Sequence, residues 1–80
     1  MSVTAFVLVT TTVGKTKEVL KGLSKINGVK SVDAVMGPYD IIAVVEGDSL
    51  ESIGKLITGH FHKVEGVERT TTCQTIRVAA

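Results

Sequence analysis

The sequence predicts an α+β fold of the ferredoxin-like βαββαβ type, in which a four-stranded antiparallel sheet carries two helices on one face. The spacing of apolar side chains along the chain predicts the order strand, helix, strand, strand, helix, strand. A length of 80 residues accommodates one domain and one small core. The first and third predicted strands, residues 3–10 and 41–46, are apolar on both sides, as central strands should be.

The first half of the chain predicts a strand followed by a helix. Residues 3–10 (VTAFVLVT) are rich in β-branched side chains, which favour strands. Residues 15–27 carry apolar side chains at helical spacing, namely Val19, Leu20, Leu23 and Ile26. Thr12 or Thr16 is expected to cap the start of this helix, and Gly28 to end it.

The second half predicts two strands, a helix and a last strand. Residues 29–36 alternate weakly between apolar and polar, and residues 41–46 are almost wholly apolar. Asp48 or Ser49 is the expected N-cap of the second helix. We expect one continuous apolar stripe along that helix, formed by Leu50, Ile53, Ile57, Phe61 and Val64. The last predicted strand, residues 67–78 (VERTTTCQTIRV), is long and rich in Thr.

Two helices can cover only one face of the sheet, although both faces of the central strands are apolar. Phe6 and Leu8 point opposite to Ala5, Val7 and Val9, and Ile42 and Val44 point opposite to Ile41, Ala43 and Val45. One set must therefore meet water or another subunit. The single Cys excludes an internal disulfide, so oligomerisation is the expected stabiliser of this short chain. We predict a homodimer that forms through the sheets, as in a dimeric α/β barrel.

Charge and hydropathy exclude several partners. Nine basic and eight acidic side chains leave a net charge of +1, which does not attract nucleic acid or anionic membranes. No apolar run approaches the ~20 residues of a membrane span, and no signal peptide is evident. The chain is therefore expected to be cytoplasmic. The lysines at positions 15, 17, 21 and 25 are typical of a solvated helix face.

The sequence indicates neither a metal nor a cofactor. His60 and His62 are two residues apart, and on a helix such residues point roughly 200° from each other. They cannot share one ion, and no third ligand lies nearby. Cys73 lies within a Thr-rich strand and is interpreted as a reduced, small hydrophobic residue rather than a nucleophile.

The turn after the second strand is the best candidate for a binding site. It contains Gly37, Pro38, Tyr39 and Asp40. A rigid Gly-Pro turn at the rim of a sheet presents backbone N–H groups, a phenol and a carboxylate together, which suits a small zwitterion. The alternative is a structural turn, in which Asp40 caps its own backbone and Tyr39 packs on a neighbour.

Several motifs spread along the chain resemble the effector-binding domain of Lrp/AsnC transcriptional regulators, also called the regulation-of-amino-acid-metabolism (RAM) domain. The motifs are an apolar strand ending in Thr-Thr and Gly over residues 5–14, Gly28-Val29, Val35-x-Gly37-x-Tyr39-Asp40, and Gly66-Val67-x-x-Thr70-x-Thr72. The resemblance covers residues 3–78.

The resemblance implies a ferredoxin-like domain that dimerises through its sheets and assembles further, often as a ring of dimers. It implies that an amino acid binds between dimers, against the loop with Gly37, Tyr39 and Asp40, with polar contacts from Thr70 and Thr72. Pro38 completes the candidate set and stands where many relatives have a charged or flexible residue.

The functional expectation is a ligand-sensing module. The first strand begins two residues after Met1, so the chain resembles the stand-alone form, a single effector-binding domain over residues 1–80 without a helix-turn-helix. We expect it to bind an amino acid or related metabolite and to modulate full-length Lrp/AsnC-type regulators without contacting DNA. One alternative is a small dimeric α/β-barrel enzyme with His60, His62 or Asp33 as base, in a cleft between sheet and helices. Another is a structural partner that co-assembles with full-length regulators.

Overall fold

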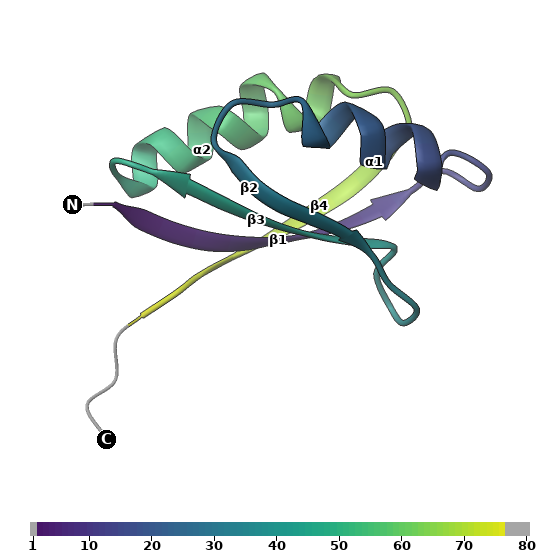
Figure 1. The fold of residues 1–80 in the computed structure, drawn as a ribbon, viewed down its shortest axis with the longest axis horizontal. Coiled ribbons are helices and arrows are strands. Elements are labelled where there is room, and N and C mark those ends of the chain that lie inside the picture. The colour runs from purple at the N-terminus through teal and green to yellow at the C-terminus, as the bar shows by residue number, and fades with distance from the viewer. Residues whose placement is uncertain (1, 77–80) are drawn as a thin grey trace.

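The computed structural model describes residues 2–76, which form a four-stranded antiparallel sheet with both helices on one face (Figure 1). The elements in chain order are β1 (Val3–Thr11), α1 (Thr16–Ser24), β2 (Val29–Ala34), β3 (Ile41–Gly47), α2 (Leu50–Gly59), the short 3₁₀ helix η1 (Phe61–Lys63) and β4 (Val67–Gln74). The strand order is β2-β3-β1-β4. The predicted ferredoxin-like fold, and the central positions of the first and third strands, are confirmed.

The two helices start differently. Ser49 caps α2 as predicted, since its hydroxyl accepts a hydrogen bond from the backbone N–H of Ser52 at 3.1 Å. The predicted Thr cap of α1 is wrong: the N-cap residue is Lys15, which makes no side-chain cap. The Thr16 hydroxyl lies instead beside that of Thr11, at 2.8 Å. The threonine at the start of α1 therefore ties the helix to the end of β1.

The predicted stripe along the second helix is wrong at both ends. Leu50 is 57% exposed, and α2 ends at Gly59 because His60 leaves the helical conformation, with φ −128° and ψ −51°. The chain then turns through η1, which directs Phe61 into the core, where it is fully buried. The second strand ends at Ala34, two residues earlier than predicted. Residues 77–78 of the predicted last strand lie outside the described residues.

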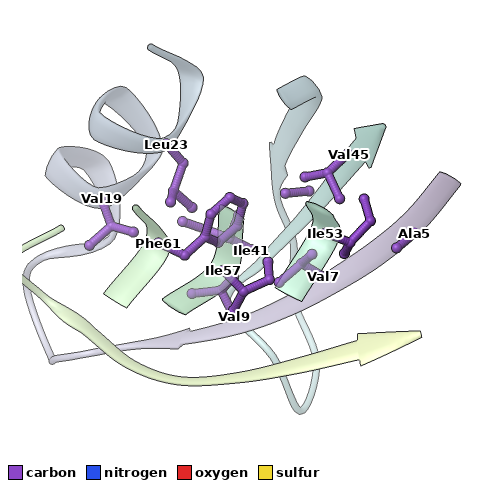
Figure 2. Close-up of a cluster of buried hydrophobic side chains, with 11 residues drawn as sticks. Ala5, Val7, Val9, Val19, Leu23, Ile41, Val45, Ile53, Ile57 and Phe61 are labelled. Carbon is purple, nitrogen blue, oxygen red and sulfur yellow. The ribbon is translucent and has the colours of Figure 1, made fainter. Parts of the chain in front are cut away.

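The core lies between the sheet and the helices. Its sheet side consists of alternate residues of β1 and β3, namely Ala5, Val7, Val9, Ile41, Ala43 and Val45, all fully buried. Val19 and Leu23 of α1, Ile53 and Ile57 of α2, and Phe61 pack onto them (Figure 2). The structure thus determines which of the two apolar sets faces the helices. No helix within residues 2–76 is long and apolar enough to cross a membrane.

The other apolar set lies on the opposite, open face of the sheet. Phe6 is the direct cross-strand partner of Val44, and Leu8 of Ile42, so these four side chains share one face. We call them the open-face patch. Phe6 is 41% exposed, and no element of the described chain covers this face. The structure therefore confirms that the sheet keeps an uncovered apolar surface at its centre.

Gly66, in the turn before β4, lies tightly against α1. Its φ is +102°, which only glycine adopts at little cost. A Cβ at this position would lie 2.8 Å from Val19 Cγ2 and 2.9 Å from Lys15 Cβ. The Gly66 carbonyl accepts a hydrogen bond from the backbone N–H of Thr12 at 2.8 Å. This glycine thus lets the β4 turn join the start of α1.

Gly66→Ala is expected to lower the free energy of unfolding by ~1–3 kcal/mol, because alanine is strained at this φ and meets two side chains. Gly54→Ala is the matched control. Gly54 is helical with open space around its Cα, so alanine should raise stability by ~0.5–1 kcal/mol. Urea unfolding measures both changes. Equal effects of the two substitutions would contradict the proposed packing of Gly66 on α1.

Candidate ligand-binding site

The candidate turn is a six-residue loop between β2 and β3, residues 35–40, which projects from one end of the sheet (Figure 1). Two backbone hydrogen bonds fix its base: Val35 N–H donates to the Asp40 carbonyl, and Asp40 N–H donates to the Val9 carbonyl, both at 2.9 Å. Gly37 and Pro38 at the tip are exposed, whereas Tyr39 is half-buried. Gly37 has a φ of +152°, which favours glycine. The base is therefore held rigidly while the tip remains accessible.

The Asp40 carboxylate anchors this loop to β1. Its Oδ2 accepts hydrogen bonds from the Thr11 backbone N–H at 2.8 Å and from the Thr11 hydroxyl at 3.3 Å. Since that hydroxyl donates to Asp40, the Thr16 hydroxyl donates to Thr11 in turn, at 2.8 Å. Thr11 is the buried polar residue of the described chain, at 9% exposure. The structural alternative for Asp40 is thus partly right, but its partner is the neighbouring strand rather than its own backbone.

Thr70 and Thr72 lie on the edge strand β4, opposite Val9 and Val7 of β1. Direct cross-strand partners share a face, so both threonines lie on the helix side of the sheet. Thr70 is half-buried, and its hydroxyl lies 3.0 Å from His62 Nε2. Thr72 is exposed. The two hydroxyls form a polar row along the helix side of this edge.

The loop and the threonines are separate within one subunit. Val9 pairs with Ile41 on one side and Thr70 on the other, which aligns the three residues in a row across three strands. Neighbouring strands are about 4.8 Å apart, so Ile41 and Thr70 are about 10 Å apart. A ligand that contacts both sets must therefore span β1, or take the sets from different subunits.

The other chemically reactive side chains are scattered. Asp33 is exposed and pairs with Ile42, which places it on the open face. His62 and His60 are exposed on the helix side, and Cys73 is a free, exposed cysteine opposite Phe6. Within residues 2–76, no group of three His, Cys, Asp or Glu side chains could hold a metal ion. The candidate bases of the enzyme alternative therefore lie on opposite faces of the sheet.

The space where that enzyme cleft was expected is filled. Between sheet and helices lie the fully buried side chains of Val7, Val9, Val19, Leu23 and Phe61.

Sequence reasoning missed two contacts that organise the candidate site. Thr11 and Asp40 are 29 residues apart, and His62 and Thr70 are eight apart, so neither pair forms a local motif. The polar Thr11 at a buried position of an otherwise apolar alternation was an available signal. His62 offered no comparable signal.

Comparison with known proteins identifies the class. The model of the Lrp/AsnC ligand binding domain matches residues 4–79, and the chain belongs to this family. The HTH-type transcriptional regulator LysM of Sulfurisphaera tokodaii is 38% identical over 63 residues, which cover 79% of this chain. The chain spans less than half the length of the curated relatives it matches, 37% of one and 44% of the other.

Solved structures have the same fold. The crystal structure of TTHA0845 from Thermus thermophilus has a TM-score of 0.90 and 31% sequence identity, and the match covers 98% of both chains. The L-Met complex of the transcriptional regulator NMB0573 from Neisseria meningitidis has a TM-score of 0.85 at 16% identity, and covers 94% of this chain and 50% of that one. The second likeness is one of fold alone.

Asp40→Ala is expected to lower the free energy of unfolding by ~1–3 kcal/mol, because it leaves the N–H and hydroxyl of the buried Thr11 without their acceptor. Asp40→Asn keeps an oxygen at the same place and should retain most of that stability. Urea unfolding of the two variants measures the difference. If alanine and asparagine were equally harmless, the anchoring role of Asp40 would be wrong.

Proposed function

We propose that this chain is a regulatory module that binds an amino acid and does not itself catalyse a reaction. The observation that carries the proposal is the 35–40 loop, which is anchored at its base by Asp40 and accessible at Gly37 and Pro38. The chain belongs to a ligand-binding family that includes transcriptional regulators, and one protein of the same fold, NMB0573, was solved as an L-Met complex. These facts together favour a small amino acid as the ligand.

The backbone of the loop supplies suitable donors. Within residues 2–76, the backbone N–H groups of Met36, Gly37 and Tyr39 donate to no acceptor of the protein. Backbone N–H groups that converge at a turn favour an anionic oxygen. We assign the ligand carboxylate to these donors and to Tyr39. Pro38 lacks an N–H and fixes the turn that presents them.

The Asp40 carboxylate has a second role in the proposed site. Its Oδ2 is occupied by Thr11, and its Oδ1 has no partner within the described residues. Oδ1 is then available for the ligand ammonium, while Thr70 and Thr72 contribute hydroxyls from β4 to the carboxylate end of the ligand. Because these two sets lie about 10 Å apart across β1, we place the complete site between subunits.

Subunit association is proposed to occur through the open-face patch. Phe6, Leu8, Ile42 and Val44 are contiguous on a face that no described element covers. A second copy that packs its own patch against this one would bury both, in a two-fold arrangement. Association of such dimers into a ring would then bring the 35–40 loop of one dimer to another. In this assembly the chain would bind the amino acid and pass the resulting change to full-length Lrp/AsnC-type regulators.

Tyr39→Ala is expected to weaken amino-acid binding at least tenfold and to leave the fold intact, because Tyr39 lies in a loop and outside the core cluster. Calorimetry with the amino acid that gives the largest thermal shift among the twenty measures the affinity. Thr58→Ala, on the exposed surface of α2, is the control. If none of the twenty amino acids bound while the oligomer stayed intact, that result would contradict the sensing function and favour a structural co-assembly partner.

Phe6→Asp is expected to convert the dimer to monomer, because pairing of the sheets would bury an unpaired charge. Leu50→Asp is the matched control, since Leu50 is similarly exposed but lies on α2. Light scattering after gel filtration gives the mass of each variant. A Phe6→Asp variant that stays folded and dimeric would place the interface elsewhere.

A further inference from the structure

We propose that His62 is a positioning residue for Thr70, which sets whether the Thr70 hydroxyl donates or accepts and so makes amino-acid binding stronger in mildly acidic solution. This inference rests on the proposed function, in which Thr70 contacts the ligand. The observation behind it is the hydrogen bond between His62 Nε2 and Thr70 Oγ1, at 3.0 Å.

Both partners are held by rigid structure. Thr70 lies in the paired part of β4, opposite Val9. His62 follows Phe61, which is fully buried, and the η1 turn is closed by the backbone hydrogen bond from Val64 N–H to the Phe61 carbonyl, at 3.1 Å. The imidazole itself is exposed. The contact is therefore built by the fold and is open to solvent.

The protonation state of His62 changes what Thr70 can offer. In a neutral imidazole, Nε2 either accepts a hydrogen bond or donates one, depending on the tautomer. When Nε2 accepts, the Thr70 hydrogen points at His62, and only the oxygen lone pairs face a ligand. A charged imidazole has hydrogens on both nitrogens, so Nε2 only donates. The Thr70 hydrogen is then free to donate to a ligand carboxylate.

The positive charge of a protonated His62 also strengthens binding of the ligand carboxylate. Histidine is the side chain that gains its charge between about pH 8 and pH 5. Within residues 2–76, no carboxylate forms an ion pair with His62. The charge gained on protonation is therefore not already neutralised, and it favours a carboxylate at Thr70.

Other titratable groups on the surrounding elements contribute to the electrostatic field at His62. They are Lys55 of α2, His60 at the end of α2, Lys63 of η1, Glu65 in the next turn, and Glu68 and Arg69 of β4. Lys15 of α1, which contacts Gly66, is paired with Glu18 at 3.3 Å. His60 is the other histidine on these elements, which makes it the appropriate control.

The test is the pH dependence of binding. L-Methionine is the first probe, followed by the amino acid with the largest thermal shift. Neutral amino acids keep the same zwitterionic form from pH 8 to pH 5.5, so the ligand itself does not change between the two measurements. The protein is expected to bind about two- to fivefold more tightly at pH 5.5. His62→Gln, whose amide preserves a hydrogen bond to Thr70 without titrating, should bind equally at both pH values. His60→Gln should keep the full pH dependence.

The outcomes separate the two proposals. Tight binding with no change between pH 8 and pH 5.5, or an unchanged pH dependence in His62→Gln, overturns the role of His62 and leaves the sensing function in place. Loss of the pH dependence in His60→Gln alone also overturns it. Absence of binding by any amino acid at either pH overturns the proposed function, and this inference with it.

Discussion

The fold depends on the burial of one apolar face of β1 and β3 beneath two helices. The six core residues that these strands contribute are fully buried, and both helices and η1 pack side chains onto them. Burial of the Val and Ile side chains among them contributes roughly 1.5–3 kcal/mol each, which makes the helix-covered face the main source of stability. The same alternation places Phe6, Leu8, Ile42 and Val44 on the other face. The uncovered apolar surface is thus a direct consequence of how the core is built.

Polar contacts position the candidate site around this core. The Asp40, Thr11 and Thr16 side chains join the 35–40 loop to the end of β1 and the start of α1. His62 and Thr70 join η1 to β4 on the other side of β1. Both networks start from residues that flank fully buried positions, Ile41 and Phe61. The core therefore determines where the polar groups lie, and the loop tip at Gly37 remains free for a ligand.

The sequence predicts the fold well, because hydrophobic periodicity decides it. The alternation in residues 3–10 and 41–46 was sufficient to identify the two central strands and to predict that one of their apolar faces stays uncovered, but not to decide which one. It could not determine that α2 ends at Gly59, since Phe61 fits the helical stripe and is buried through η1 instead. The candidate loop was identified from its residue types, whereas the anchor from Asp40 to Thr11 required the strand register. Contacts between residues far apart in sequence cannot be read from local patterns.

The proposed function depends on binding of an amino acid at the 35–40 loop and at β4. Titration of the ¹⁵N-labelled protein with L-methionine, and with the other amino acids in turn, locates such a site, because the chemical shift of each backbone N–H reports its own surroundings. We expect the largest shifts at the amides of Met36, Gly37 and Tyr39, with a second group at Thr70 and Thr72. Shifts confined to the outer face of α2, or no shifts with any amino acid, would contradict binding at this site.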